Sequence, residues 1–159
     1  MKLWLPVLLC AILFAGTFSC KKPNNSPIPF LSFTGFVPDT IIAGLNESKA
    51  HLLFHFSDGD GDLGNRGPNK YDVFLRDLRD SAYPVMQYTF PPIPDGAIDP
   101  IKGVSGDGAI EIIGSTISLR ADTIHLVQGD TAIFEMWIMD RANHMSNVVT
   151  TKPLYIKQL

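Results

Sequence analysis

Alternating apolar and polar positions run through most of the chain after residue 30 and predict short β-strands. The clearest alternation lies in 49–57 (KAHLLFHFS), where every second side chain is large and apolar. Successive side chains of a strand point to opposite faces, so one face of this segment is expected to be buried. Leu52, Phe54 and Phe56 form the predicted buried face, and His51, Leu53 and His55 form the other.

Shorter runs repeat this pattern between turn residues, and no long stretch has the helical period. The most apolar run is 131–139, which places Phe134, Met136 and Ile138 on one side. Pro153 cannot donate a hydrogen bond to a neighbouring strand, so its segment requires an edge position or a bulge. The folded part begins near 31–37, and the strands predicted after it are 49–57, 71–76, 109–113, 117–119, 123–127, 131–139 and 147–157.

A proline- and glycine-rich segment, 84–108, interrupts these strands. It is long for a structureless loop, so we expect a functional or covering loop with a short strand near 85–90. This loop covers the apolar face that holds Ile133 and Trp137, or that face is a patch for a partner. About seven short strands separated by turns predict an all-β fold, an antiparallel β-sandwich.

The C-terminal segment 129–151 resembles the last two strands of bacterial immunoglobulin-like domains. An apolar strand ends there in an Asp-x-x-Asn turn, and a Ser/Asn-rich start of the final strand follows. The resemblance implies that 31–159 forms an immunoglobulin-like antiparallel β-sandwich of about seven strands.

The first 19 residues form a separate unit. Lys2 precedes the apolar stretch 3–18, which has the length of a signal-peptide core and is marginal for a spanning helix. The sequence Thr17-Phe18-Ser19-Cys20 resembles a bacterial lipobox, with Thr17 in place of the usual leucine and with lysines after the cysteine, as in Bacteroidetes lipoproteins. The resemblance implies a signal peptide over 1–19, cleavage before Cys20 and a proline-rich tether over 20–30. An ordinary signal peptide and an uncleaved anchor helix are the alternatives.

The use of cysteine agrees with lipid attachment. Cys10 lies in the segment to be removed, so Cys20 would be the one cysteine left and no disulfide could form within the mature chain. Two or more acyl chains on Cys20 would give stable membrane anchoring. Residues 21–24 lack the acidic run that marks surface export in the lipoproteins they resemble. The expected location is therefore the periplasmic side of the outer membrane.

Charge and motif content narrow the function classes. The chain has 159 residues, enough for one domain, and its net charge of −3 provides no basic surface for nucleic acid. It contains no Gly-x-Ser-x-Gly elbow, His-Glu-x-x-His helix or phosphate loop, so an enzyme is not expected. The other candidate groups lack partners at ligand or catalytic spacing: His51, His55, His125, His144, Asp99, Asp107 and Glu111.

The segment 58–64 (DGDGDLG) is the strongest chemical feature of the sequence. Its three aspartates alternate with glycines, a spacing that suits calcium because every second residue can turn a carboxylate inward. The match to an EF-hand loop is partial, since Leu63 stands at the sixth position and Asn69 at the twelfth. An Asp-Gly turn without metal is the alternative, although repulsion among the carboxylates favours a cation.

A second loop is expected beside this one. If 49–57 and 131–139 are strands B and F of the sandwich, they run in the same direction and the loops after them cluster at one end. The predicted oxygen ligands are then Asp58, Asp60, Asp62, Asp140 and Asn143. Arg66 and Arg141 lie in the same loops, so salt bridges to the aspartates without metal are the alternative.

Most of the remaining chain also resembles a recurrent class of Bacteroidetes lipoproteins. Residues 51–76 and 103–112 (GVSGDGAIEI) carry this resemblance, which centres on a Phe-x-Asp-Gly-Asp-Gly-Asp loop on a sandwich. It implies fold and location and no defined activity. We therefore expect a non-catalytic, lipid-anchored envelope module that binds a protein or glycan, with calcium as a candidate cofactor. A small metal-assisted envelope hydrolase and a purely structural envelope protein are the alternatives.

Overall fold

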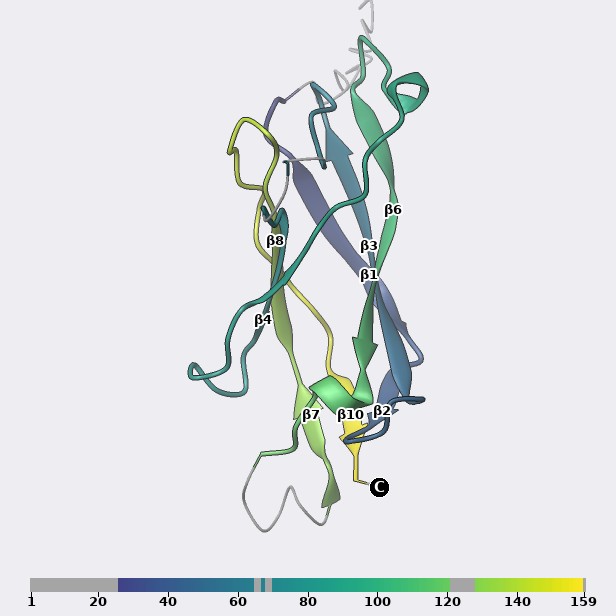
Figure 1. Ribbon diagram of the computed structural model, residues 1–159, viewed down its shortest axis with the longest axis vertical. Helices are drawn as coiled ribbons and strands as arrows, with labels where there is room; N and C mark the ends of the chain where they lie inside the picture. The colour runs from purple at the N-terminus through teal and green to yellow at the C-terminus, as the bar shows by residue number, and fades with distance from the viewer. Residues whose placement is uncertain (1–25, 65–66, 68–69, 121–127, 159) are drawn as a thin grey trace, which may run out of the picture.

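The computed structural model describes residues 26–64, 67, 70–120 and 128–158, and these residues form an all-β fold (Figure 1). It contains two short 3-10 turns, Asp95–Ala97 and Gly114–Thr116. No helix within it has the length and apolar character needed to span a membrane. The strands are β1 (Phe30–Val37), β2 (Thr40–Ile42), β3 (Lys49–Asp58), β4 (Val73–Asp77), β5 (Met86–Tyr88), β6 (Val104–Ile113), β7 (Asp130–Ala132), β8 (Phe134–Ile138), β9 (Val149–Thr150) and β10 (Leu154–Lys157).

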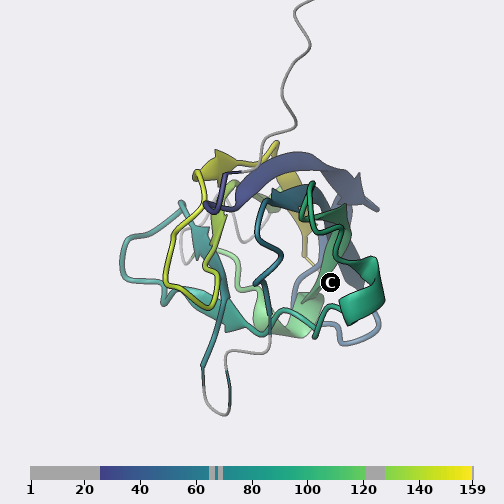
Figure 2. The same ribbon diagram turned by 90° about the horizontal axis from the view of Figure 1, so that it is seen from above.

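These strands form three small sheets around one core (Figure 2). One sheet has the order β1-β3-β6 and a second has the order β5-β4-β8-β9. The third, β2-β10-β7, lies at the end of the molecule that holds the C-terminus (Figure 1). Its β2 and β10 run parallel, so the sandwich is not purely antiparallel as predicted.

The prediction for 49–57 is confirmed by β3, the central strand of its sheet. Leu52, Phe54 and Phe56 are buried, because their side chains meet the opposing sheets across the core. His55 lies on the solvent-facing side of the same strand, opposite Asp107 of the neighbouring strand β6. The largest side chains packed in the interior include Phe134, Leu31, Ile41, Leu52, Leu75, Ile112, Met136, Ile138, Leu154 and Ile156.

Two apolar runs that predict single strands are each divided between two sheets. Residues 131–139 break at Ile133: Ala132 pairs with Leu154 in the terminal sheet, and Phe134 pairs with Asp77 in the four-stranded sheet. The run 147–157 breaks before Pro153 in the same way, since β9 pairs with β8 and β10 pairs with β7. Pro153 has no backbone N–H to donate to a neighbouring strand, which explains why the change of sheet occurs there.

The other strand predictions have mixed outcomes. Residues 109–113 are the end of the longer β6, and β5 falls inside the short strand predicted near 85–90. The strand predicted over 71–76 begins at Val73, with Tyr71 outside it and exposed. Residues 117–119 pair with no strand, so that prediction is wrong, and 123–127 lie outside the described residues. The divided runs and the unpredicted β2 account for a strand number above the expected seven.

A buried ion network links the end of β4 to the first residue of β7. Arg79 donates to both carboxylate oxygens of Asp77, with Nη2 to Oδ2 at 2.6 Å, and its Nη1 lies 2.9 Å from Asp130 Oδ2. Arg120 donates to the other oxygen of Asp130 at 2.6 Å. Burial alone would raise the pKa of Asp130, but hydrogen bonds from Arg120, Thr131 and Arg79 hold it well below its usual value. The network therefore keeps its charges paired away from water.

Candidate metal centre

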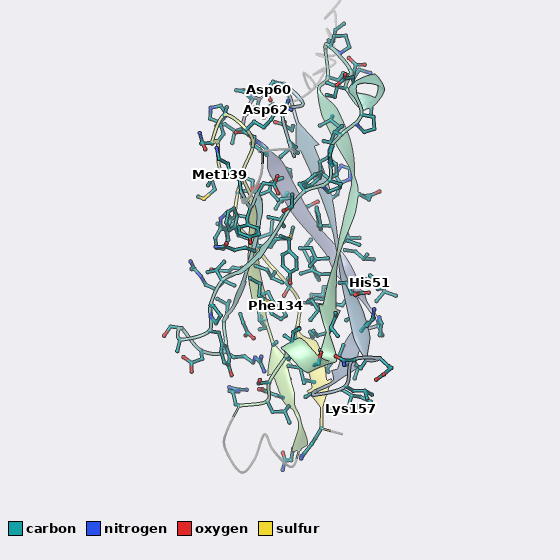
Figure 3. The ribbon with its side chains drawn as sticks, in the orientation of Figure 1. His51, Asp60, Asp62, Phe134, Met139 and Lys157 are labelled. Atoms are coloured by element: carbon teal, nitrogen blue, oxygen red, sulfur yellow. The ribbon has the colours of Figure 1, made fainter. Side chains whose placement is uncertain are left out.

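Three carboxylates converge at the end of the sandwich opposite the C-terminus. Asp58 is the last residue of β3, Asp62 lies in the loop that follows, and Asp140 comes shortly after β8. Each offers an oxygen, and these three oxygens all lie within 4.8 Å of one another. Figure 3 shows this end with Asp60 and Asp62 labelled, far from Lys157 on the last strand. The predicted meeting of the loops after 49–57 and 131–139 is confirmed.

Backbone hydrogen bonds hold the two loops together. The Asp62 N–H donates to Asp58 Oδ2 at 2.9 Å, which closes the acidic loop on itself. Gly61 makes this turn with a φ of 68°, a conformation that glycine adopts without strain. Across the gap, the Arg141 N–H donates to the Asp62 carbonyl at 3.2 Å and the Ala142 N–H donates to Asp62 Oδ2 at 3.1 Å. The carboxylate positions are thus set by main-chain geometry from both loops.

Two of the carboxylate oxygens are buried without a hydrogen bond. They are Asp58 Oδ1 and Asp62 Oδ1, whose partner oxygens accept the backbone bonds just described. The Asp58 residue is 2% exposed, so water does not reach it freely. A buried polar atom without a partner costs about 1–3 kcal/mol, and more when it is charged. A cation is the partner that would satisfy both oxygens at once.

The electrostatics of the cluster lead to the same conclusion. Burial, together with the charges of Asp60 and Asp62, raises the pKa of Asp58 from 3.8 to about 7. Burial also raises the pKa of Asp62, with Asp140 and Asp60 as the next causes. These carboxylates therefore repel one another when ionised. A divalent cation would reverse that repulsion.

Asp140 has a histidine partner that sequence reasoning missed. The His144 N–H donates to Asp140 Oδ1 at 2.7 Å, and His144 Nδ1 lies 2.9 Å from Asp140 Oδ2. The hydrogen bond and the charge of Asp140 raise the pKa of His144. The same ring nitrogen lies 3.1 Å from the Pro27 carbonyl, so the chain just before β1 lies beside the site. The spacing of four residues between Asp140 and His144 is the signal that could have found this pair.

The other predicted ligands lie outside the group of three. Asp60 is exposed, although its charge acts on both loop aspartates. Asn143 is exposed with a φ of 72° and forms the turn that returns the chain to Asp140, through an N–H to carbonyl bond of 3.2 Å. Arg66 lies outside the described residues. No ion pair joins Arg141 to an aspartate in the part of the chain that is described, although its charge lowers the pKa of Asp62.

The donor set fits a hard divalent cation. Carboxylate oxygens are the ligands that calcium and magnesium prefer, and calcium takes about six to eight oxygens in flexible geometry. Three carboxylates would supply part of such a shell, with backbone carbonyls and water as the remaining donors. Thiol or imidazole ligands, which favour zinc, do not occur in this group of three.

A second cluster lies on the outer face of β3 and β6. Ser105 Oγ is 3.0 Å from His55 Nε2, and His55 Nδ1 is 2.9 Å from Asp107 Oδ1. The order of these contacts is that of a catalytic triad, but the Asp107 side chain is 86% exposed and that of His55 is 46% exposed. In open solvent such contacts have the character of ordinary cross-strand pairs. Asp99 and Glu111 do not join them, since Asp99 caps its own turn and Glu111 pairs with Lys49.

Comparisons with known proteins leave the family open. No protein-family model matches the chain, and no curated protein matches it. Among solved structures, the chain is similar to a Niemann-Pick type C2 protein from the Japanese carpenter ant, with 16% identity and a TM-score of 0.40. That match covers 80% of this chain and 93% of the other.

Proposed function

We propose that the protein is a non-catalytic binding module of the bacterial cell envelope. Lipid on Cys20 holds it to the periplasmic side of the outer membrane, and a calcium ion occupies the site of Asp58, Asp62 and Asp140. The observation that carries the proposal is the convergence of three carboxylates, two of which keep a buried oxygen without a hydrogen bond. A bound cation satisfies those oxygens and holds two loops in one shape. The partner of this loop surface is a protein or a glycan.

An immunoglobulin-like arrangement supports the binding role through its loops. The loops after β3 and β8 come together at one end of the molecule, as the loops of an immunoglobulin sandwich do. A fold of this kind serves many functions, so the fold alone does not select one. The cation site makes this end different from the other, because the shape of the loops depends on an ion.

The proposed tether leads directly to the cation site. The Gly59 N–H donates to the Ser26 carbonyl at 2.9 Å, so the described chain begins beside the acidic loop. Six residue steps separate Cys20 from Ser26, which limits the distance between them to about 20 Å. Lipid on Cys20 would therefore hold the acidic end of the sandwich near the membrane surface and leave the β2-β10-β7 end pointing away.

Calcium is expected to raise the melting temperature of the purified protein by several degrees relative to the protein in EDTA. The physical reason is that a ligand bound by the folded state alone stabilises it, by about 2.7 kcal/mol at one hundred times its Kd. Differential scanning fluorimetry across a calcium series, with magnesium in parallel, measures this shift. D62N is expected to abolish it, because Asp62 contributes an unpartnered buried oxygen.

Two aspartate variants sharpen this test. D95N removes an exposed carboxylate outside the group of three and is expected to leave the calcium shift intact. D60N is expected to reduce the shift only in part, because Asp60 acts on the site through its charge. A wild-type melting temperature indifferent to both calcium and EDTA would overturn the cation site.

The lipid anchor has a matched pair of cysteine variants. C20A is expected to lose all incorporation of a clickable palmitate analogue in the producing bacterium, because no acceptor thiol remains at the cleavage site. C10A alters the other cysteine of the chain and is expected to keep full incorporation. Gel fluorescence of the purified variants measures both outcomes. Palmitate label retained by C20A would contradict the anchor.

The non-catalytic assignment also has a direct test at the outer face of β6. Serine nucleophiles are activated by a base in a site that excludes water, and the exposed Ser105, His55 and Asp107 do not provide one. A fluorophosphonate reagent is therefore expected to leave Ser105 unlabelled. Covalent labelling of Ser105 that H55A removes would favour the hydrolase alternative.

A further inference from the structure

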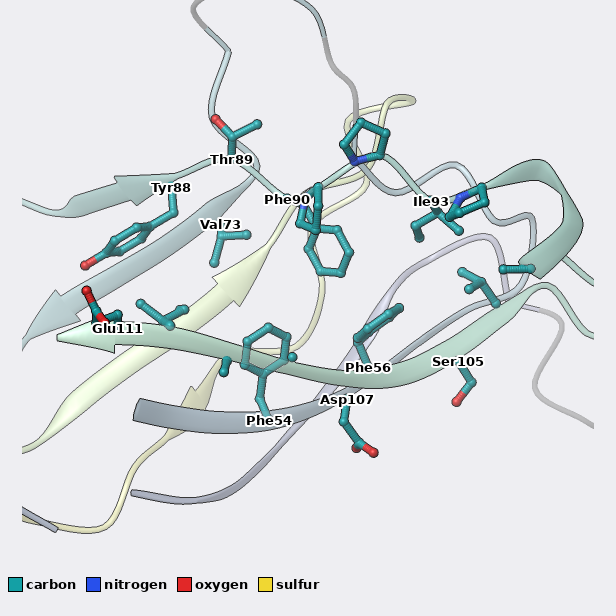
Figure 4. A pocket seen from close by; sticks show the side chains of 18 residues that line it. Phe54, Phe56, Val73, Tyr88, Thr89, Phe90, Ile93, Ser105, Asp107 and Glu111 are labelled. Carbon is teal, nitrogen blue, oxygen red and sulfur yellow. The ribbon is translucent and has the colours of Figure 1, made fainter. Parts of the chain in front are cut away.

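A pocket of about 540 Å³ lies between the sheets on the side opposite the β1 edge. One wall is β6, the edge strand of the β1-β3-β6 sheet, and the other is the start of β4 with the chain just after β5. The proline-rich segment 89–94 crosses between them (Figure 4). The volume falls in the range of about 300–1,000 Å³ that is usual for small-molecule sites.

Aromatic rings form the inner surface of this pocket. Phe54 and Phe56 point into it from β3, as Figure 4 shows, and Phe90 faces them from the proline-rich segment. The Phe56 and Phe90 rings meet edge to face, with centroids 4.9 Å apart. These three side chains belong to the hydrophobic core but keep 4–7% of their surface exposed, while Leu52 and Phe134 keep none. The pocket is therefore an opening into the core itself.

Glycines in β6 leave this volume unfilled. Alternate residues of β6 face the core, and two of these inward positions are Gly106 and Gly108. A Cβ atom at Gly108 would lie 2.3 Å from the ring of Phe54, and one at Gly106 would lie 3.2 Å from the ring of Phe56. The two rings thus lie directly over the glycine backbone. Larger residues there would push the rings into the space that is now open.

The charges near the pocket are already paired on the outer face of the sheet. Glu111 binds Lys49 at 3.1 Å, and Asp107 binds His55 at 2.9 Å. The Asp107 and Ser105 side chains point away from the rings in Figure 4. At the rim, the partner of the Tyr88 hydroxyl among the described residues is a weak acceptor, Met86 Sδ, at 3.6 Å, and burial raises the pKa of Tyr88. An anionic ligand would find no cationic side chain among the residues that line the pocket, whereas an uncharged hydroxyl would find Tyr88.

We propose that this pocket binds the hydrocarbon chain of an uncharged single-chain lipid, with the hydroxyl-bearing head beside Tyr88. The rings of Phe54, Phe56 and Phe90 bury the chain, and burial of apolar surface drives binding. This assignment does not depend on the cation site, because none of the three carboxylates lines the pocket.

Fluorescence of N-phenyl-1-naphthylamine, an uncharged apolar probe, tests the pocket in the purified full chain. We expect saturable binding of one probe per chain and displacement by 1-monolauroylglycerol. Laurate, which has the same chain and a negative charge, is expected to displace the probe at least tenfold less well. The variant Y88F is expected to weaken monolauroylglycerol and to leave the probe unaffected, since only the glycerol head reaches the hydroxyl.

Three tryptophan variants localise the binding. I93W and A97W add bulk at the wall of the pocket and are expected to weaken probe binding at least tenfold. Ala97 is exposed, so we expect A97W to fold like the wild type. A82W makes the same change at an exposed alanine outside the pocket and is expected to bind normally. D62N is expected to bind the probe like wild type, which separates this result from the cation test.

Several results would overturn the proposal. Absence of saturable probe binding, or equal binding by I93W, A97W and wild type, would show that the pocket takes no small apolar ligand. Laurate equal to monolauroylglycerol would overturn the uncharged class. A second copy of the chain is the competing occupant: sedimentation that shows a dimer, with probe bound only after dilution to monomer, would assign the surface to that contact instead.

Discussion

Replacing Arg79 with methionine is expected to lower the free energy of unfolding by about 3–5 kcal/mol, the loss typical of a broken buried ion pair. The Arg79 side chain is 5% exposed, and it neutralises Asp77, which is 5% exposed, and Asp130, which is fully buried. Methionine fills much of the same volume without a charge. It would leave Asp77 without its bidentate partner and Asp130 with Arg120 as its remaining arginine partner.

Arg76 provides a matched control in β4, the strand that ends at Asp77. R76M makes the same change at a side chain that is 50% exposed and lies 3.4 Å from Glu135, so it is expected to cost less than about 1 kcal/mol. The Arg76 guanidinium also lies over the Trp137 ring, 5.3 Å from its centroid. Such a contact near the surface contributes about 0.5–1 kcal/mol, so its loss keeps the expected cost of R76M small. Urea unfolding measured by tryptophan fluorescence compares the two. Equal midpoints for R79M and R76M would contradict a structural role for the buried network.

The strand pattern predicts much of this fold because alternation reports burial directly. For 49–57 the periodicity identifies both the strand and its buried face, since β3 is central and meets solvent on one side. Periodicity does not report which partner a strand pairs with. Residues 131–139 keep one alternating pattern across β7 and β8, although the ladder changes at Ile133 from β10 to β4. Long-range pairing of this kind leaves no mark in local sequence.

The candidate site divides in a similar way. The prediction that two strands of the same direction bring their following loops together correctly places Asp140 beside the acidic loop. The alternation of aspartates treats Asp58, Asp60 and Asp62 as equivalent, but the turn at Gly61 buries the oxygens of the first and third and leaves Asp60 exposed. Turn geometry, set by one backbone φ, decides which carboxylates converge. The pocket at β6 was not predicted, because glycines in a strand signal a missing side chain without locating the space beside it.

D58N is expected to stabilise the calcium-free protein at pH 8 while removing its response to calcium. The asparagine keeps an oxygen to accept the Asp62 N–H, which now binds Asp58 Oδ2 at 2.9 Å. It replaces the unpartnered Oδ1 with an amide that can donate to the neighbouring carboxylates. The variant therefore removes one buried charge and one unsatisfied acceptor together. Loss of a ligand oxygen and of negative charge should abolish calcium binding.

The dependence on pH gives this prediction its sign. Asp58 has a pKa of about 7 in the folded protein against 3.8 in an unfolded chain, so between these pH values the folded state holds a proton that the unfolded state has released. In EDTA the contribution of Asp58 to the stability of the wild type is therefore fully present below about pH 4, falls as the pH rises and levels off above about pH 7. At about 1.4 kcal/mol per pH unit, the fall amounts to at most about 4 kcal/mol.

Asparagine cannot ionise, so D58N is expected to lack this fall. Its advantage over the wild type in EDTA should be largest at pH 8 and should shrink toward pH 4, where Asp58 carries its proton. Urea unfolding at pH 4, 6 and 8 measures the difference, with D95N as the matched control that keeps the wild-type profile. A D58N protein less stable than wild type at pH 8 in EDTA would mean that the carboxylate is satisfied without a cation. Three outcomes are expected together: higher stability without calcium, no calcium shift and a smaller fall of stability between pH 4 and pH 8 than in the wild type. Together they identify Asp58 as a residue whose charge destabilises the fold and serves to bind a cation.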